Sequence, residues 1–261
     1  MTQAQLGTVY LVGAGPGDPE LLTVKAHSLL RKCDALVYDS LIPQELLALV
    51  SDSCHLHFVG KRRGHHSVPQ LKTNSVLLEM ARSHLCVVRL KGGDPFLFGR
   101  GAEEAAYLEK HGVAVEIVPG VTAGIAVPAY VGIPVTHRLA GSSVTFVTGH
   151  EGIDKSRPSV NWQELGKASD GLVIYMGLHN LQHIVNELIS GGLDPSTSSA
   201  VIQQGTVIGQ RCIKSPLNEL PAVAKEHKFE SPAIIMIGRY VDFQIASCAP
   251  EPANVTMPIA F

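Results

Sequence analysis

The chain has 261 residues, of which 45% are hydrophobic and 17% charged, so a disordered chain is excluded and a sizeable core can form. Its 21 basic and 23 acidic residues give a formal net charge of −2, which argues against a protein that holds nucleic acid by overall positive charge. At about 150 residues per domain, this length predicts two small domains that share a cleft.

Three features of the sequence bear on its compartment. No apolar run approaches the roughly 20 residues that a membrane helix needs. The amino terminus has no basic segment before its apolar run, as a secretion signal would have. The cysteines, an odd number without a C-x-x-C pair, predict reduced thiols and neither a disulfide framework nor a thiolate zinc site. We therefore expect a cytoplasmic protein without a membrane or nucleic-acid partner.

The first half of the chain alternates short β-rich runs with helical patterns, which predicts parallel βαβ units. Strands are expected at 8–12, 35–39, 55–59, 86–90 and 113–118, and helices at 20–32, 43–50, 67–82 and 102–110. The stretch 119–139 is rich in Gly, Pro and small residues, which is typical of a connection between domains.

The second half is expected to form a mixed sheet. Its strands are predicted at 143–148, 172–176, 200–204, 210–214 and 233–237, and its helices at 162–167, 181–190 and 217–227. The gap between 204 and 210 is too short for the crossover that a parallel pair needs. The expected fold class is therefore α/β, with an N-terminal domain at 1–119 whose sheet is mostly parallel, a C-terminal domain at 120–243 and a tail at 244–261.

A glycine turn, GAGPG at 13–17, directly follows the first predicted strand. It resembles a dinucleotide fingerprint, and Asp39 lies about where a ribose-binding acid is expected, some twenty residues on. The spacing is G-x-G-x-G, however, and Pro16 lacks the N–H that a pyrophosphate would use. The turn is compatible with a ligand site, of which NAD binding is one form, and with a plain tight turn.

A second loop, RLKGGDPFLFGRG at 89–101, follows the buried fourth strand. Because ligands of open α/β sheets bind beyond the carboxyl ends of the strands, both loops can face one crevice. Gly92 and Gly93 let the backbone approach a ligand, Asp94 can accept from hydroxyl or ammonium groups, and the apolar residues 96–98 can form a wall. The other interpretation is a βα turn capped by Asp94, with the aromatic rings in the core.

Basic residues stand after several predicted strands: Lys61, Arg62, Arg63, Arg100 and Arg138. Taken singly, each is typical of a solvated surface charge. Their shared placement suggests that they converge on a polyanion, since arginine binds carboxylates in a bidentate manner.

A metal site is not expected. His55 and His57 share one face of a strand, but no carboxylate or further cysteine has a supporting spacing. A serine nucleophile is not expected either, because the chain has no G-x-S-x-G motif.

Taken together, these motifs make the chain similar to the tetrapyrrole methylases, the class III S-adenosyl-L-methionine-dependent methyltransferases. The matching strings extend over about residues 9–241 and are GPGDPELLT, VYD, VGKRRGHHSVPQ, RLKGGDPFLFGRG, VPGVTAG, GIPVTHR, YMGL, QGT and SPAIIMIGR. GDP occurs throughout this family, whereas RLKGGDPFLFGRG together with VGKR and THR resembles the members that methylate uroporphyrinogen III.

The resemblance implies two α/β domains around a cleft, usually in a homodimer, and roles for particular residues. Asp39 and Lys61 match the proton acceptor and donor, although Lys61 can equally anchor a substrate carboxylate. Arg100 and Arg138, with Arg62 and Arg63, are assigned to the anionic periphery of the substrate. The methyl donor is expected at Pro16, Gly92, Gly93, Asp94, Leu97, Thr122, Ala123, Met176 and Gly205, and the glycine turn would line the tetrapyrrole side.

The implied reaction is two successive methyl transfers to pyrrole carbons of uroporphyrinogen III. It yields precorrin-2 and S-adenosyl-L-homocysteine without a metal, in the synthesis of sirohaem and cobalamin-type tetrapyrroles. The alternatives are another precorrin methylase and a Rossmann-like NAD-binding protein. Some relatives carry an amino-terminal dehydrogenase and ferrochelatase module, whereas this chain begins shortly before the first methylase strand, so we expect it to stop at precorrin-2.

Overall fold

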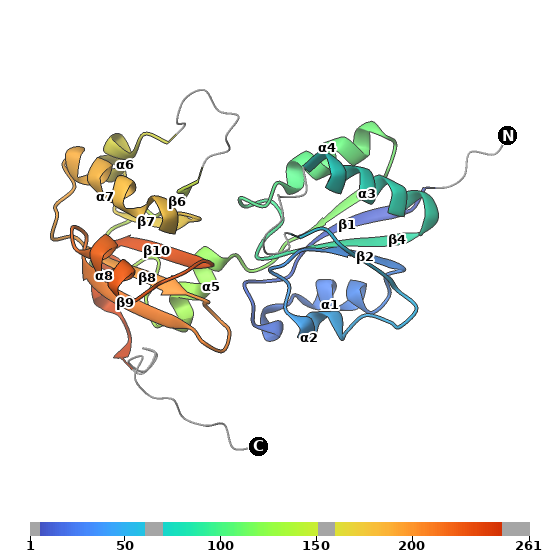
Figure 1. Cartoon of the computed structure of the whole chain (residues 1–261), viewed down its shortest axis with the longest axis horizontal. Coiled ribbons are helices and arrows are strands. Elements are labelled where there is room, and N and C mark those ends of the chain that lie inside the picture. Colours follow the sequence, from blue (N-terminus) through green and yellow to red (C-terminus); the bar gives the residue numbers. More distant parts are fainter. Residues whose placement is uncertain (1–5, 61–69, 151–159, 247–261) are drawn as a thin grey trace, which may run out of the picture. The chain divides into compact units, whose positions relative to one another are not determined.

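The computed structural model describes residues 6–60, 70–150 and 160–246. Its internal contacts divide the chain into two compact units, Met1–Thr122 and Ala123–Phe261 (Figure 1). The sequence places the domain boundary between residues 119 and 120, in the same connecting segment.

The first unit is a five-stranded parallel sheet with helices on both faces (Figure 1). The strand order is β3-β2-β4-β1-β5, so β4 lies between the first two strands of the sequence. The strands are β1 Thr8–Gly13, β2 Ala35–Tyr38, β3 His55–Phe58, β4 Cys86–Lys91 and β5 Val115–Val118. The helices are α1 Val24–Leu30, α2 Gln44–Leu47, α3 Gln70–Ser83 and α4 Gly101–Lys110. The mostly parallel sheet predicted from the sequence is confirmed.

Alternating residues of the central strands supply two separate cores. Leu11 and Val37 face α3 and α4, whereas Leu36 and Leu90 face α1 and α2. All four side chains are fully buried, which is why these strands are apolar on both faces.

The prediction of one helix over 20–32 is wrong about where the helix begins, because the segment forms two elements. A 3₁₀ turn, η1 (Pro19–Leu21), comes first, and α1 begins only at Val24. Asp18 caps the turn by accepting from the Glu20 N–H at 2.8 Å, and Thr23 caps α1 by accepting from the Ala26 N–H at 3.2 Å. Two N-caps a few residues apart favour two short elements.

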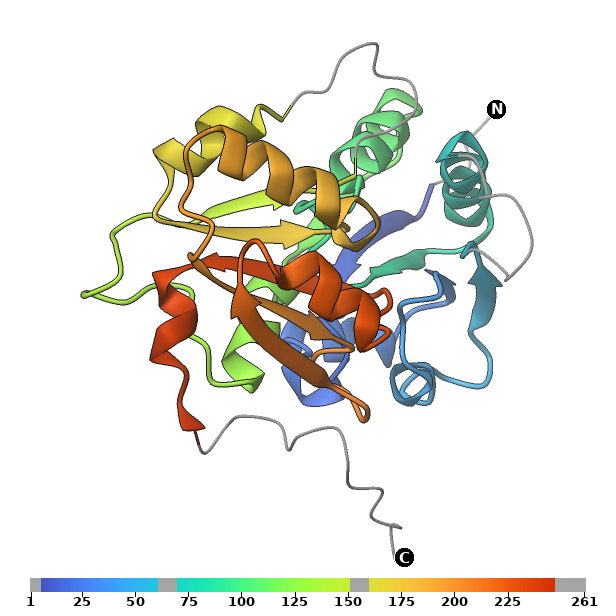
Figure 2. The ribbon, with the colours of Figure 1, turned by 60° about the vertical axis from the view of Figure 1, so that its left-hand side comes forward.

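The second unit is a five-stranded mixed sheet of order β6-β7-β10-β8-β9. Only β6 and β7 run parallel, and the other pairs are antiparallel, so the predicted mixed sheet is confirmed. The strands are β6 Thr145–Thr148, β7 Gly171–Tyr175, β8 Ser198–Gln203, β9 Arg211–Pro216 and β10 Ala233–Gly238. One face is covered by α6 Trp162–Ala168, α7 Leu181–Ser190 and α8 Leu220–Glu226 (Figure 2). Two 3₁₀ turns, η2 Leu178–Asn180 and η3 Arg239–Phe243, complete the unit.

The other face of this sheet is covered by a helix that sequence reasoning missed. The composition of 119–139 is typical of a connection between domains and predicts no helix, yet Ala123–Tyr130 forms α5, with Pro128 inside it. Gly124, Ala126, Val127 and Pro128 are buried, and Val127 packs with Val173 and Ile202 of the sheet. Burial of this small-residue face outweighs the low helix propensity of Gly and Pro.

The longest described helix, α3, has 14 residues. In the parts of the chain that the structure describes, no helix is long and apolar enough to cross a membrane.

The thiols of Cys33, Cys54, Cys86 and Cys212 are free, and the first two are buried with their sulfurs 3.6 Å apart. Burial raises the pKa of Cys33 and of Cys54. The fifth cysteine, Cys248, lies outside the described residues.

Candidate functional site

The carboxyl ends of the parallel strands of the first unit lie at one edge of its sheet. There the last residue of β1, Gly13, meets Gly93 and Gly120 of the segments that follow β4 and β5. A Cβ on Gly120 would lie 2.4 Å from the Gly93 carbonyl oxygen and 2.7 Å from the Gly13 Cα. The three segments therefore pack main chain against main chain, at a distance that only glycine permits.

Backbone N–H groups of the glycine turn donate hydrogen bonds within this packing. The Ala14 N–H donates to the Lys91 carbonyl at 2.8 Å, and the Gly15 N–H donates to the Gly93 carbonyl at 3.3 Å. Pro16, half-buried in the same turn, has no N–H to offer. These positions therefore have no amide for a pyrophosphate, which disfavours the NAD-binding alternative.

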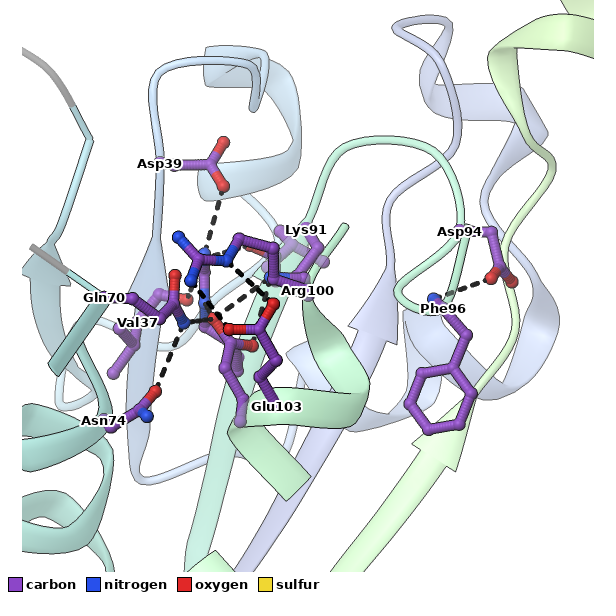
Figure 3. A network of polar contacts seen from close by, with 12 residues as sticks. Val37, Asp39, Gln70, Asn74, Lys91, Asp94, Phe96, Arg100 and Glu103 are labelled. Carbon is purple, nitrogen blue, oxygen red and sulfur yellow. Dashed lines mark hydrogen bonds and ion pairs between the residues drawn. The ribbon is translucent and has the colours of Figure 1, made fainter. Parts of the chain in front are cut away.

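The loop after β4 combines the two interpretations of its sequence. Asp94 does cap the turn, since its Oδ1 accepts from the Phe96 N–H at 2.8 Å (Figure 3) and its Oδ2 accepts from the Gly120 N–H at 3.1 Å. The aromatic rings are not in the core, however: Phe96 is 53% and Phe98 38% exposed. The alternative that places these rings in the core is therefore wrong, since they lie at the surface beside the half-buried Gly92, Gly93 and Leu97.

Asp39 stands immediately after β2 and is held on both carboxylate oxygens. Its Oδ1 accepts from the Leu41 N–H at 3.1 Å, and its Oδ2 pairs with a terminal nitrogen of Arg89 at 3.2 Å (Figure 3). The Asp39 side chain is 25% exposed, whereas that of Arg89 is only 6% exposed. The carboxylate therefore has a fixed orientation and keeps part of its surface open to a ligand.

A buried ionic cluster lies beneath Asp39. Glu104, in the first turn of α4, contacts Arg89 Nε at 3.4 Å and Lys91 Nζ at 3.0 Å. Burial lowers the pKa of Lys91 and the Arg89 guanidinium lowers it further, whereas Glu104 opposes both effects. With Asp39 the cluster contains two cations and two anions, which limits the cost of burying it.

Sequence reasoning missed Arg89, Lys91 and Glu104 as a group. The signal was present in β4, where Arg89 and Lys91 stand two residues apart in an otherwise apolar strand. Side chains at this spacing share one face, so two buried cations there require an anion. The sequence cannot show that α4 supplies it, because that depends on how the helix packs on the sheet.

Arg100, a predicted substrate anchor, immediately precedes α4 and is paired with Glu103 in the first turn of that helix. Its Nε lies 3.0 Å from Oε1 of Glu103, and a terminal nitrogen lies 2.7 Å from Oε2. Both side chains are more than half exposed, and the hydrogen bond from Arg100 lowers the pKa of Glu103. A substrate carboxylate can reach this guanidinium from solvent, in competition with Glu103.

Three of the predicted donor-binding residues of the second unit lie on elements that contact one another. Met176 follows β7, Gly205 follows β8 and Ala123 begins α5. A Cβ on Gly205 would lie 2.3 Å from Val127 of α5, and the Tyr175 hydroxyl accepts from the Gly124 N–H at 2.6 Å. Thr122 is half-buried and ends the first unit.

Strained backbone is concentrated in these loops. Among the described non-glycine residues, six have a positive φ, and all but Lys228 lie in loops that carry predicted site residues: Phe98, Arg100, Met176, Gln204 and Thr206. A left-handed conformation costs roughly 1–2 kcal/mol for a residue with a side chain. Such strain is typical of segments shaped for a ligand.

Arg138 lies on an exposed loop of the second unit that borders a cavity of about 920 Å³, lined by Thr136, His137, Arg138, Leu139, Gly141 and Ser142. The loop is tied down by Asp170, whose Oδ2 accepts from the Ser142 N–H at 2.9 Å and the Ser143 N–H at 3.0 Å. Hydrogen bonds from these serines lower the pKa of Asp170.

Three of the predicted basic residues cannot be placed, and the structure also bears on the question of a metal site. Lys61, Arg62 and Arg63 lie outside the described residues. In the described ranges, no group of three or more His, Cys, Asp or Glu side chains is arranged to hold a metal ion. The rings of His55 and His57, on β3, have centroids 6.4 Å apart.

Comparison with known proteins is consistent with this arrangement. The sequence model of the family of tetrapyrrole (corrin/porphyrin) methylases matches residues 8–221 of this chain. The uroporphyrinogen-III C-methyltransferase of Synechocystis sp. is 48% identical over 98% of this chain and 94% of its own length. That of Methanocaldococcus jannaschii is 46% identical over 90% of this chain and 97% of its own length.

A solved structure gives the same result. The crystal structure of uroporphyrin-III C-methyl transferase from Thermus thermophilus complexed with S-adenyl homocysteine is 37% identical, with a TM-score of 0.76. The match covers 90% of this chain and 93% of that one. The predicted two-part α/β fold is thereby confirmed, and the chain belongs to the tetrapyrrole (corrin/porphyrin) methylase family.

Proposed function

We propose that this chain is an S-adenosyl-L-methionine-dependent C-methyltransferase that converts uroporphyrinogen III to precorrin-2 by two successive methyl transfers. The observation that carries the proposal is the 48% identity to the Synechocystis uroporphyrinogen-III C-methyltransferase over 98% of this chain. An oriented carboxylate at the strand ends of the first unit agrees with it. The product serves sirohaem and cobalamin-type tetrapyrrole synthesis.

The residues assigned to the methyl donor have chemistry that fits it. An adenosyl group is flat, largely apolar and rimmed by hydrogen-bonding atoms, which suits glycine backbone beside apolar side chains. Gly92, Gly93 and Leu97 are half-buried in the first unit, and Met176 is 49% exposed in the second. When bound, S-adenosyl-L-methionine supplies a methyl group made electrophilic by its sulfonium. Pro16, Asp94, Thr122, Ala123 and Gly205 complete the proposed donor site.

We assign the role of proton acceptor to Asp39. The pyrrole carbon attacks the methyl group as an enamine does, and the bond from that methyl group to sulfur breaks. Positive charge develops on the ring nitrogen, and a base must be in reach to accept the proton that the ring system then loses. Asp39 is partly exposed, and hydrogen bonds from Leu41 and Arg89 hold its two oxygens. The carboxylate can therefore meet the substrate without first rearranging, which lowers the entropic part of the barrier.

The substrate side is proposed to be basic. Uroporphyrinogen III is a polycarboxylate, and Arg100 and Arg138 are exposed guanidinium groups suited to bidentate carboxylate binding. Arg62, Arg63 and Lys61 are proposed for the same periphery, and Lys61 can also return a proton.

We also propose a cytoplasmic homodimer. The family resemblance supports the dimer, and the free thiols of the described cysteines are what a reducing compartment maintains. Sedimentation equilibrium is expected to give twice the chain mass of 27.8 kDa. The mass of a single chain, measured at micromolar concentration, would contradict the proposed dimer.

The test is an anaerobic assay of the purified chain with S-adenosyl-L-methionine and, in separate arms, uroporphyrinogen III or a later precorrin. Mass spectrometry after oxidation is expected to find a dimethylated product in the first arm only. Methylation confined to the later precorrin would identify another methylase of the family. Calorimetry with S-adenosyl-L-homocysteine and with NAD separates either enzyme from the NAD-binding alternative, which predicts tight binding of NAD alone.

A further inference from the structure

Glu104 is the most deeply buried carboxylate of the described chain, at 1% exposed. It accepts from three side chains on two other elements: Gln70 Nε2 of α3 at 3.0 Å, Arg89 Nε of β4 at 3.4 Å, and Lys91 Nζ of β4 at 3.0 and 3.1 Å. A side chain buried to this degree is out of reach of a substrate. Whatever it does for the reaction, it does through its neighbours.

Arg89 connects Glu104 with the surface. While its Nε faces Glu104, one terminal nitrogen pairs with Asp39 Oδ2 at 3.2 Å and the other donates to the Leu90 carbonyl at 2.9 Å. Each guanidinium nitrogen thus has an acceptor in a different direction. The plane of the group is fixed, and the inner carboxylate is one of the groups that fix it.

Asp39 is the outer end of this chain of contacts (Figure 3). Its Oδ2 depends on Arg89, and its Oδ1 takes the N–H of Leu41. If Arg89 tilts, its contact with Oδ2 is lost, and the carboxylate can rotate about the side-chain bonds of Asp39. The orientation of Asp39 therefore depends on Glu104, two contacts away.

Stability alone does not account for the cluster. Replacing a buried ion pair by well-packed apolar groups is often neutral or stabilising, because desolvation of the charges is costly. Elsewhere on α4, the fully buried Leu108 belongs to the apolar core between the helix and the same sheet. The buried charges are found where the contacts lead to Asp39.

We propose that Glu104 is a positioning residue for methyl transfer: it holds Arg89, and Arg89 holds the carboxylate of Asp39 in the direction of the bound substrate. The inference rests on the proposed function, in which Asp39 accepts the proton. It adds that the competence of Asp39 is set by a helix, α4, that follows the next strand along the sheet.

The first test is Glu104→Gln, which keeps the shape of the side chain and replaces one acceptor oxygen by a donor. We expect kcat to fall about 10- to 100-fold, since a misplacement of about 1 Å can cost about 100-fold. The KM for S-adenosyl-L-methionine and the calorimetric Kd of S-adenosyl-L-homocysteine should stay within about twofold of wild type. Glu109→Gln, exposed on the same helix, is the matched control and should behave as wild type.

A double-mutant cycle separates positioning from a structural role. If Glu104 acts through Asp39, Glu104→Gln should cause little further loss of transfer in an Asp39→Ala background, where residual product is quantified by mass over hours. A cluster that only holds α4 on the sheet predicts the same fold loss in both backgrounds, and predicts weaker donor binding as well.

Each outcome decides the matter. Equal fold losses in the two backgrounds, or a Glu104→Gln kcat equal to wild type, would overturn the inference and leave the proposed function intact. A wild-type chain that does not methylate uroporphyrinogen III would overturn the function and the inference with it. If Glu104→Gln does not fold by circular dichroism, Glu104→Asp replaces it. That variant keeps the charge but is one methylene shorter, and a wild-type kcat for it would likewise overturn the inference.

Discussion

The sequence identifies Asp39 as a candidate site residue, but only the folded structure shows what orients its carboxylate. Its place after a predicted strand and its match to the family motif are visible in the sequence. Its partner Arg89 stands 50 positions away, and the contact between them follows from the adjacency of β2 and β4. Which strands lie next to each other depends on the tertiary fold. The sequence therefore predicts Asp39 as a site residue but does not predict the groups that orient it.

Replacing Asp39 by Ala should leave donor binding intact and remove most turnover. A positioned base contributes typically 10²- to 10⁴-fold, and we expect a loss of about that size in kcat. Calorimetry with S-adenosyl-L-homocysteine and steady-state rates check the two parts, with Asp52→Ala, on an exposed turn, as the control. Turnover equal to wild type would remove Asp39 from the mechanism.

The glycine contact beneath the site makes a prediction about stability. In Gly120→Ala the new Cβ would lie 2.4 Å from the Gly93 carbonyl oxygen, so the backbone segments must separate. We expect unfolding in urea to show a loss of about 1–3 kcal/mol or more, as for overpacked cores. At Gly112 a Cβ would meet nothing within 4 Å, so Gly112→Ala should lose only the free energy that its positive φ costs, and Gly120→Ala should lose clearly more than this control. Equal losses at the two positions would contradict the close packing.

At the scale of single elements, most strands and helices were predictable because their apolar periodicity is strong. The helix expected at 181–190 is found there as α7, with Leu181, Ile184, Val185 and Leu188 buried on one face. α5 was not predictable, because its Gly and Pro content is typical of a loop. It forms because its small residues lie close against the second sheet, and that surface exists only in the folded unit.

The loop that carries Arg138 should lose its anchor in acid. Hydrogen bonds from Ser142 and Ser143 lower the pKa of Asp170 in the folded state. A folded pKa below the unfolded value means that Asp170 adds stability above pH ~4 and that this contribution disappears as the pH falls through the folded pKa. Asp170→Asn should therefore be less stable than wild type at pH 7, and the difference should shrink towards pH 3.

Urea unfolding of both proteins at several pH values checks this, with Asp52→Asn as a control in an exposed turn. A difference between wild type and Asp170→Asn that stays constant down to pH 3 would show that the charge of Asp170 is not what holds the loop.

The loop between β4 and α4 carries a prediction about substrate specificity. Arg100 and Glu103 form an exposed pair, so Arg100→Ala should change stability by less than about 1 kcal/mol. If Arg100 binds a substrate carboxylate, the KM for uroporphyrinogen III should rise about 10- to 100-fold, as expected for a lost charge-assisted hydrogen bond. Steady-state kinetics with Arg31→Ala, an exposed control, measure this. A loss found wholly in donor affinity would refute the assignment.

At the scale of the whole molecule, the sequence predicts two α/β units, one with a parallel and one with a mixed sheet, because connection lengths limit strand direction. The order of the strands within each sheet could not be predicted from the sequence. That β4 lies between β1 and β2, and β10 between β7 and β8, depends on which crossovers bury the most apolar surface. This order determines which loops meet at the first sheet's edge, and so brings together the ion cluster and the glycine contact.

The central proposal is that methyl groups pass from S-adenosyl-L-methionine to carbons of uroporphyrinogen III. The direct measurement is an anaerobic turnover with a methyl-deuterated donor, followed by mass spectrometry of the tetrapyrrole and quantification of S-adenosyl-L-homocysteine. We expect two deuterated methyl groups in each product molecule and the release of two molecules of S-adenosyl-L-homocysteine. A tetrapyrrole that remains unlabelled while S-adenosyl-L-homocysteine accumulates, or no consumption of the donor at all, would contradict it.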